Sequence, residues 1–407
     1  MRTVLIVSLV FALGYSLSRP VMSTSWALLG VRWIFLSGAE LLLLGYLAGP
    51  EGIGLLTTET LERLDPVLHL AVAWAGLIFG LQFSRRQLRV YPPRRYALAF
   101  LQALISGVVV GALAVPLLRS IFPQAPGGIV ARGAVLLALC SSVTSPTSLH
   151  YVATVLGHRG RFGRLLRFIA GVDGIPAVLA LGAFTGLFHV STRGQGGVLA
   201  GWQWLAVATL GGLVLGLLFS VMAALELSRD ELLLVVLGMV VLTGGLAYSL
   251  ELSALYVSFV MGLTVANTGW IHEEIHKVVG HAEHAIYLSL LVLAGAALRL
   301  DAAVAMVAVA LVGLRVLAKV LGNLHWRWLR ERDARVSWLG AGLLSQGGIA
   351  MVIAIDFELI YRNDPVGADL TRSLLSAVLV AVLLNETLSP FGLRLTLGRA
   401  KARGDLS

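Results

Sequence analysis

Asp173 is an ionisable side chain in the middle of an apolar segment, residues 162–190. A charged side chain in a bilayer is costly, so it usually faces the protein interior and often marks an ion or proton pathway. Upstream of it, the stretch CSSVTSPTSLHYV (140–152) interrupts a second apolar segment with hydroxyl-bearing residues and Pro146. An interrupted membrane helix beside a buried carboxylate predicts a binding site for a small ion.

The predicted depth of Asp173 fits such a site. It lies roughly ten residues from the cytoplasmic end of its segment, which is about 15 Å at the helical rise and close to the middle of a hydrocarbon core of about 30 Å. A carboxylate there can hold a proton or a monovalent cation, but not both. It is the only carboxylate that we place in the core, so one-for-one electroneutral exchange is the simpler stoichiometry. The alternative is a structural ion pair that locks two helices.

The residues around Pro146 are suited to bind a hard cation. Pro146 lacks an N–H group, and carbonyl groups freed near the interruption must find other partners inside the membrane. Together with the hydroxyls of Thr144 and Ser145, these carbonyls would form an oxygen cage for Na+ or K+. The alternative is that the polar side chains only satisfy the backbone at a kink.

Arg315 and Lys319 are basic residues one helical turn apart in a later apolar segment, so they share a helix face. Arg315 matches Asp173 in depth, whereas Lys319 is nearer the surface and could extend its ammonium towards water. We expect one of them to compensate the charge of Asp173. The sequence leaves open which one, and a purely structural role is the alternative for each.

Four histidines lie close together in a segment that we expect to be a cytoplasmic loop: His272, His276, His281 and His284. Histidine titrates near neutral pH, so a pH sensor is one interpretation. A solvated loop without such a role is the other. We expect no cofactor and no metal beyond the transported cation.

The composition is that of a helical membrane protein. The 407 residues are 57% hydrophobic and 13% charged, and the mean hydropathy is +0.87. The chain has no GxxxxGK[ST] motif, no HExxH motif and no nucleophile–base pair that we recognise, so we expect a secondary transporter and not an enzyme. The net charge of +9 comes largely from loops between apolar segments, and we expect no nucleic-acid partner.

We expect about thirteen membrane spans of roughly 20 residues, the fifth and twelfth interrupted, at residues 3–18, 26–48, 67–84, 95–118, 128–156, 163–189, 200–224, 231–249, 252–268, 284–299, 302–325, 336–357 and 368–389. Most arginines and lysines follow odd-numbered spans. The positive-inside rule then places the N-terminus outside and the C-terminus in the cytoplasm, in the cell (inner) membrane. The first span resembles a signal peptide, but its removal would invert this charge pattern, so we retain it.

Two groups of three spans, residues 95–189 and 302–389, have the same order with opposite orientation. Each has an interrupted middle helix, and the second interruption comprises Ser345, Gln346, Gly347 and Gly348. Matching interruptions in inverted halves point to a binding site at the midplane. We expect one transmembrane domain, residues 1–393, and a short basic cytoplasmic tail, residues 394–407.

Several segments in this order resemble the monovalent cation:proton antiporter superfamily, with its sodium/hydrogen exchanger-like membrane domain. They are residues 76–89, 141–149, 163–181, 272–301, 314–322, 339–354 and 383–394. The resemblance covers nearly the whole chain. It implies an all-helical fold with twelve or thirteen spans, two inverted repeats and two broken, crossing helices. It also implies a homodimer and an elevator-like core that moves against a scaffold.

The sequence departs from this family at two motifs. Many members carry Thr-Asp-Pro at the first interruption, where this chain has Thr144-Ser145-Pro146. Members carry Asn-Asp or Asp-Asp on the ion-binding helix, where this chain has Val172-Asp173-Gly174. If Val172-Asp173 is aligned with Asn-Asp, Asp173 is the residue that binds the ion. If Asp173-Gly174 is aligned with Asp-Asp, Asp173 is the partner of the lysine, and Gly174 takes the place of the binding carboxylate.

These observations favour alternating-access exchange of Na+ or K+ for H+. Asp173 would bind the cation or the proton, Thr144 and Ser145 would complete the cation shell, and Lys319 or Arg315 would balance the charge. One alternative is a non-transporting or channel-like relative with a sensing role. Another is an organic-anion transporter on a related inverted-repeat fold.

Overall fold

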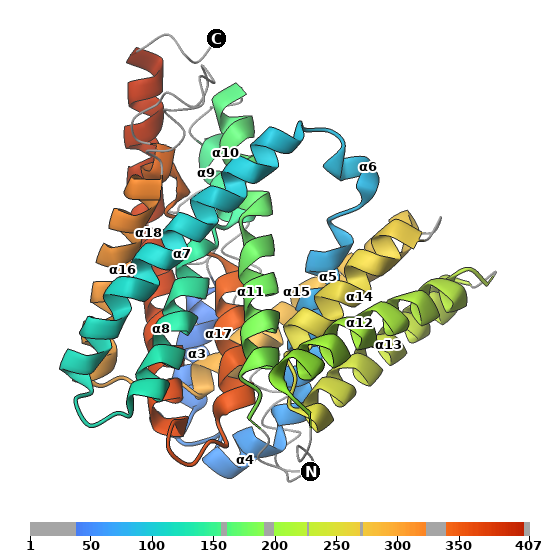
Figure 1. Ribbon diagram of the computed structural model, residues 1–407, viewed down its shortest axis with the longest axis horizontal. Coiled ribbons are helices and arrows are strands. Elements are labelled where there is room, and N and C mark those ends of the chain that lie inside the picture. Colours follow the sequence, from blue (N-terminus) through green and yellow to red (C-terminus); the bar gives the residue numbers. More distant parts are fainter. Residues whose placement is uncertain are drawn as a thin grey trace.

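The computed structural model describes residues 38–155, 161–190, 199–225, 228–268, 272–322 and 339–402. Within these ranges all regular elements are helices (Figure 1). They are α3 (Ala39–Ala48), α4 (Thr58–Arg63), α5 (Asp65–Leu81), α6 (Arg85–Leu88), α7 (Pro93–Ile121), α8 (Gly127–Ser142), α9 (Pro146–Val155), α10 (Arg161–Val172), α11 (Gly174–Leu187), α12 (Gly201–Ala223), α13 (Arg229–Leu250), α14 (Ala254–Thr268), α15 (His272–Ala296), α16 (Ala302–Gly322), the 3-10 helix η3 (Leu339–Leu343), α17 (Gly348–Tyr361) and α18 (Ala368–Ala402).

The helices have the length and composition of a membrane protein. In the described part of the chain, seven are long and apolar enough to cross a membrane, and others are shorter but also apolar. Each predicted span from residue 67 onward falls on a described helix or on a pair of consecutive helices. The first predicted span lies outside the described residues, so thirteen crossings stay a prediction.

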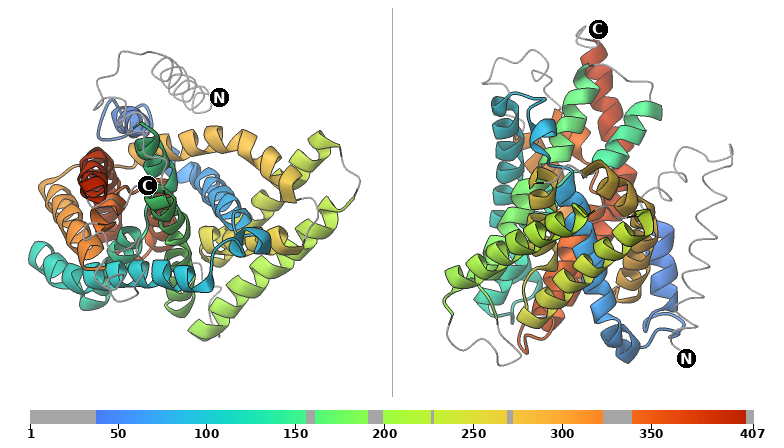
Figure 2. Two further views of the ribbon diagram at one scale, coloured as in Figure 1. Left: turned by 90° about the horizontal axis from the view of Figure 1, so that it is seen from above. Right: turned by 90° about the vertical axis from the view of Figure 1, so that its right-hand side faces the viewer.

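The helices form two groups (Figures 1 and 2). One contains α5, α12, α13 and α14, on the right of Figure 1. The other contains two triplets. The first triplet is α7, the interrupted pair α8–α9 and the pair α10–α11, and the second is α16, the interrupted pair η3–α17 and α18. Helix α16 packs against α7, so the triplets lie side by side.

Small residues let α5 and α14 approach each other closely. A Cβ atom on Gly76 would lie 2.5 Å from the carbonyl oxygen of Leu255, and one on Gly80 would lie 2.3 Å from that of Phe259. Only glycine fits at such backbone contacts, which are typical of helix pairs in membranes. The group that contains α5 and α14 is therefore tightly packed.

The two predicted interruptions are confirmed. Helix α8 ends at Ser142, Val143 is extended, and α9 begins at Pro146, the first helical position, where a missing N–H group is tolerated. In the second triplet η3 ends at Leu343, Gly347 is extended, and α17 begins at Gly348. Backbone groups that would be paired in a continuous helix are thus freed at both places.

The predicted helix over residues 163–189 is locally weakened beside Asp173. Helix α10 ends at Val172 and α11 begins at Gly174, but Asp173 keeps helical backbone angles and its N–H group bonds to the carbonyl of Ile169 at 2.9 Å. Residues 163–187 therefore form one helical segment of membrane length. The sequence GIP explains the weak point, because Pro176 lacks the N–H group that would bond to the carbonyl of Val172.

Two further boundaries differ from the sequence prediction. Residues 272–283 are not a loop, because α15 begins at His272 and continues to Ala296. The side chains of His272, His276, His281 and His284 lie outside the described residues, so a pH-sensing role stays a prediction. Helix α18 continues past residue 389 to Ala402, so residues 394–402 of the expected tail are helical.

Candidate functional site

The two interruptions contact each other. The N–H group of Ser145 donates a hydrogen bond of 3.1 Å to the carbonyl oxygen of Ser345. A Cβ atom on Gly347 would lie 2.4 Å from the hydroxyl oxygen of Ser145, so glycine permits the close crossing. The predicted interruption residues Ser145 and Ser345 are therefore neighbours across the two triplets.

Asp173 binds to the first interruption. Its carboxylate is fully buried. Oδ1 accepts a hydrogen bond of 3.0 Å from the backbone N–H of Thr144, and Oδ2 accepts one of 2.6 Å from the Thr144 hydroxyl. We predict from the sequence that Thr144 is a ligand of the ion. In the structure Thr144 donates directly to the Asp173 carboxylate.

The structure distinguishes the two basic residues. The Lys319 ammonium lies 3.3 Å from Oδ2 of Asp173 and forms an ion pair in which both side chains are fully buried. It also donates to the carbonyl oxygen of Ser142 at 2.7 Å and to the hydroxyl of Thr144 at 2.9 Å. Lys319 is thus the direct partner of Asp173.

Arg315 instead binds backbone carbonyls of both interruptions. Its guanidinium donates to the carbonyl oxygens of Ser141, of Val143 at 2.6 Å, of Leu343 at 3.4 Å and of Ser345 at 3.1 Å. Inside a membrane an unpaired carbonyl costs several kcal/mol. Arg315 gives all four a charged donor, in addition to the Ser145 N–H that bonds to Ser345 and the Thr144 hydroxyl that lies 3.5 Å from the Leu343 oxygen. The planar guanidinium can serve several acceptors at once, which an ammonium cannot do with the same geometry.

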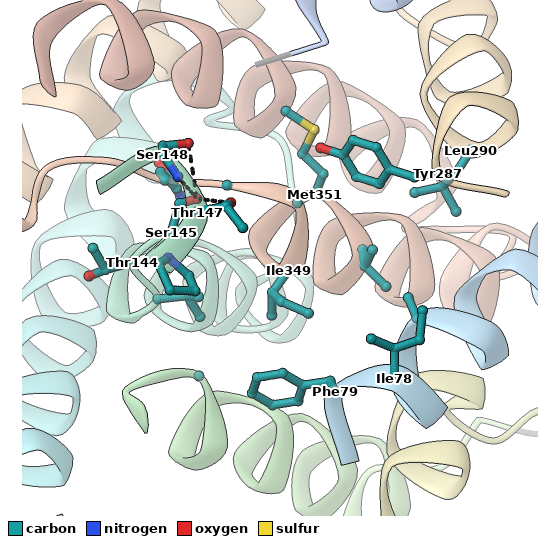
Figure 3. Close-up of a pocket in the computed structure, with 18 of the residues that line it drawn as sticks. Ile78, Phe79, Thr144, Ser145, Thr147, Ser148, Tyr287, Leu290, Ile349 and Met351 are labelled. Atoms are coloured by element: carbon teal, nitrogen blue, oxygen red, sulfur yellow. Dashed lines mark hydrogen bonds between the residues drawn. The ribbon is translucent and has the colours of Figure 1, made fainter. Parts of the chain in front are cut away.

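A cavity of about 300 Å³ lies beside this crossing (Figure 3). Its wall includes Trp74 and Phe79 of α5, Tyr287 of α15, and residues of both interruptions. Thr147 and Gln82, which also line it, are exposed, so the cavity is open at the end of α5 that we predict to be cytoplasmic. Asp173 does not line the cavity.

Thr144 and Gly174 form the wall between the cavity and Asp173. A Cβ atom on Gly174 would lie 2.8 Å from Cζ of Phe79. The position at which an Asp-Asp pattern would carry its second carboxylate is therefore covered by an aromatic ring. Asp173 therefore directly follows the cavity wall, bonded to Thr144 and next to Gly174 in the chain.

The expectation of a single core carboxylate is wrong. Glu386 of α18 is 5% exposed and lines the cavity, and one of its oxygens accepts from the Ser345 hydroxyl at 3.1 Å and from the Gln346 N–H at 3.0 Å. Asp356 of α17 is also buried. The argument for one-for-one exchange, which rested on a single carboxylate, loses its basis.

The signal for Glu386 was present in the sequence. It lies within the last predicted span, residues 368–389, and the reasoning that identified Asp173 applies to it equally. Asp356 could be found in the same way, because it lies near the end of the twelfth span. What the sequence does not show is that Glu386 faces the same cavity as the first interruption.

Gln346, the remaining polar residue of the second interruption, connects three elements. Its side-chain amide donates to the carbonyl oxygen of Cys140 at 2.7 Å and accepts from the amide of Asn385 at 2.8 Å. It thereby fixes the end of α8 and the middle of α18 relative to the crossing. Gly348, which follows, faces the ring of Tyr287, 2.7 Å from an added Cβ atom.

Comparisons with known proteins give the family and the fold of the chain. The family model for the transmembrane sodium/hydrogen exchanger matches residues 39–394. Among solved structures, the sodium proton antiporter MjNhaP1 from Methanocaldococcus jannaschii at pH 8 is 15% identical, with a TM-score of 0.66, over 98% of this chain and 99% of that one. An electron microscopy map of MjNhaP1 gives 14% identity and a TM-score of 0.63, over 98% of this chain and 97% of that one.

A comparison with curated proteins found no match. At such low identity the MjNhaP1 structures show a shared fold, and the family model supplies the relationship in sequence. Since that model spans most of the residues, from α3 to the C-terminal part of α18, the resemblance to monovalent cation:proton antiporters is confirmed and the chain belongs to the sodium/hydrogen exchanger family.

Proposed function

We propose that the protein exchanges Na+ or K+ for H+ by alternating access, with Asp173 as the shared binding group. The observation that carries this proposal is the fully buried Asp173–Lys319 pair, held at the contact of two interrupted helices and separated from a cavity by Thr144. A buried ion pair is not a strong source of stability. The position of the pair beside the cavity therefore supports a role in ion binding.

The ammonium of Lys319 marks a position that a monovalent cation can take. Three oxygens surround it: the Ser142 carbonyl at 2.7 Å, the Thr144 hydroxyl at 2.9 Å and Oδ2 of Asp173 at 3.3 Å. If Lys319 moves away or loses its proton, these oxygens provide a hard-ligand shell for Na+ or K+. Ser145 and the freed carbonyls could complete the shell. Protonation of Asp173 would release the cation, which couples the two ions.

Alternating access is supported by the asymmetry of the site. The cavity is open beside Thr147 and Gln82. On the other side of the crossing, Phe184 of α11 stacks on Phe357 of α17 with 6.1 Å between ring centroids, and Phe357 contacts Tyr361 at 4.7 Å. We propose that this aromatic cluster closes the second route to Asp173 in the state seen here.

The wider assignments belong to the same proposal. We propose inverted repeats at residues 95–189 and 302–389, within a membrane domain of residues 1–393. We also propose a homodimer in the cell (inner) membrane, with the N-terminus outside and the C-terminal tail, residues 394–407, in the cytoplasm. The partners are then the cation, H+ and the lipid bilayer.

The proposal is tested in liposomes that contain purified protein and an internal pH dye. A pH gradient is imposed, and Na+, K+ or Li+ is added in turn. We expect cation-specific loss of the gradient with the natural protein and none with Asp173→Asn. Glu59→Gln, which changes an exposed carboxylate on α4, is the matched control and should behave as the natural protein.

Three outcomes would contradict the proposal. Exchange retained by a correctly inserted Asp173→Asn protein would remove Asp173 from the mechanism. No cation response of the natural protein would favour the sensing relative or the organic-anion transporter. A folding defect of Asp173→Asn without any change in flux would show that the ion pair is only structural.

A further inference from the structure

Glu386 is a buried carboxylate on the third helix of the second triplet, as Asp173 is a buried carboxylate on the third helix of the first. Asp173 lies on the third helix of its triplet and accepts from an N–H group and a hydroxyl of the first interruption, both from Thr144. Glu386 lies on the third helix of its triplet and accepts from the Gln346 N–H and the Ser345 hydroxyl of the second interruption. Each carboxylate thus accepts from one N–H group and one hydroxyl of the interruption in its own triplet. The two donors bond to separate oxygens of Asp173 but to the same oxygen of Glu386.

The two carboxylates differ in their counter-charges. Asp173 has the Lys319 ammonium within 3.3 Å. In the part of the chain that the structure describes, Glu386 forms no ion pair with a basic side chain. Arg315 is connected to Glu386 through one peptide group. The carbonyl of Ser345 accepts from the Arg315 guanidinium, and the N–H of Gln346 in the same peptide donates to the Glu386 carboxylate.

Hydroxyl groups extend from Glu386 along the cavity wall. The Ser148 hydroxyl bonds to Glu386, and the Ser145 hydroxyl lies 3.0 Å from that of Ser148 and 3.1 Å from that of Thr147. Figure 3 shows Ser145, Thr147 and Ser148 side by side. Oxygen ligands with one negative charge are those that hard cations prefer.

The two sites also differ in access. Glu386, Ser145, Thr147 and Ser148 all line the cavity, whereas Asp173 lies behind Thr144. A cation that enters the cavity therefore meets Glu386 before it meets Asp173. Since no basic side chain among the described residues pairs with Glu386, this carboxylate can attract a cation without first displacing an ammonium.

We infer that Glu386, with the hydroxyls of Ser145, Thr147 and Ser148, forms a second monovalent-cation site that captures the cation in the cavity before it reaches Asp173. This inference rests on the proposed exchange for its role in transport. The binding site itself does not depend on exchange, because all its ligands lie outside the Asp173–Lys319 pair.

Equilibrium binding separates the two sites. Purified natural protein, Asp173→Asn, Glu386→Gln and the double variant are titrated with NaCl, KCl and LiCl in a calorimeter, at constant ionic strength set by an organic cation. We expect Asp173→Asn to keep saturable binding of at least one cation. The double variant should lose it, by about tenfold or more in affinity.

Transport gives the second readout. In liposomes, Glu386→Gln should raise the apparent KM for the cation by about tenfold, since one charged ligand is lost, with little change in the maximal rate. Glu386→Asp keeps the charge and should restore part of the affinity. Asp369→Asn, an exposed carboxylate on the same helix, is the control and should leave KM unchanged. Thermal melting of each variant confirms that it is folded.

The outcomes distinguish this inference from the proposed function. If Asp173→Asn exchanges nothing and binds nothing, the second site is disproved and the proposed function stands. An unchanged KM in a folded Glu386→Gln protein also overturns the inference, and so does a KM in Glu386→Asp as high as in Glu386→Gln. If the natural protein does not exchange ions but Asp173→Asn still binds a cation through Glu386, the proposed function fails and this site remains.

Discussion

At the scale of single residues, the crossing contains two cations and two anions with separate tasks. Lys319 faces Asp173 directly, and Arg315 faces Glu386 through the peptide group between Ser345 and Gln346. Arg315 also binds carbonyls at the ends of α8 and η3, where the helix dipole is negative. Its main effect should therefore be on the stability of the crossing, and that of Lys319 on ion exchange.

We expect Arg315→Met to destabilise the protein by about 3 kcal/mol or more, because four carbonyl oxygens lose a charged donor in a buried place. Lys319→Met should be less destabilising but should abolish cation-dependent exchange. The measurement is thermal unfolding in detergent, followed by size-exclusion chromatography, together with the liposome assay. An Arg315→Met protein as stable as the natural one would contradict this division of roles.

We expect Thr144→Val to weaken cation binding while the fold is kept. Valine has the same shape, but it removes the hydroxyl that donates to Asp173 at 2.6 Å and accepts from Lys319 at 2.9 Å. Loss of a hydrogen bond to a charged group amounts to about 1.5–3 kcal/mol, so the apparent affinity should fall by about tenfold or more. Thr144→Ser keeps the hydroxyl and should stay close to the natural protein in the same titration.

The sequence was sufficient to identify Asp173, Thr144 and the two basic residues, because charged or polar side chains in apolar segments are rare. It could not assign Lys319 or Arg315 to Asp173. Depth along a helix favoured Arg315, but the direction of each side chain decides the pairing, and that direction depends on how α16 packs against both interruptions. Glu386 was within reach of the same reasoning, yet its place beside Ser345 depends on the packing of α18.

At the scale of elements, the two interrupted helices can contact each other because small residues lie where they cross. Ser145 and Gly347 are in contact, and the Ser145 N–H is bonded to Ser345. Hydropathy located both interruptions because Pro146 and the sequence SQGG stand out in apolar runs. The weak point beside Asp173 was not predicted, because its cause, Pro176, lies one turn further along the helix. The start of α15 was missed because its first turns are polar.

Gly347→Ala should disturb the crossing selectively. An added methyl group would lie 2.4 Å from the Ser145 hydroxyl and 2.6 Å from its Cβ atom, and such overpacking costs about 1–3 kcal/mol. Gly313→Ala on α16 is the matched control, because nothing lies within 4 Å of its added Cβ atom. We expect a lower melting temperature and weaker exchange only for Gly347→Ala. Equal behaviour of the two variants would show that the crossing tolerates wider spacing than the structure indicates.

At the scale of the whole molecule, α17 joins the triplets to the group that contains α5 and α14. Asp356 of α17 accepts from the Ser253 hydroxyl at 2.5 Å and from the N–H of Ala254 at 3.0 Å, at the beginning of α14. Arg362, just after α17, binds Asp65 at the beginning of α5 and Glu358 at 2.5 Å. These contacts lie near the C-terminal end of α17, as does the aromatic cluster of Phe184, Phe357 and Tyr361, on the side that we propose is closed.

If the triplets move against the other group during exchange, these links must loosen when the closed side opens. They therefore stabilise the state seen here relative to its alternative. Removing a contribution of about 1.4 kcal/mol from one state raises the relative population of the other about tenfold. The Arg362 pairs are the better target, because Asp356 also caps α14 and its loss would disturb the fold.

We expect Arg362→Gln to expose the closed side more often. Cys140, the only cysteine, is buried, so Cys140→Ser gives a background in which Thr185→Cys reports on the buried end of α11 that is farther from Gly174. The rate of its reaction with a membrane-impermeant maleimide, added from the side away from the cavity opening, should rise by about tenfold in Arg362→Gln, as for a population shift of that size. Arg63→Gln, which breaks an exposed ion pair with Glu59, should leave the rate unchanged. An unchanged rate in Arg362→Gln would mean that the aromatic cluster alone keeps this side closed.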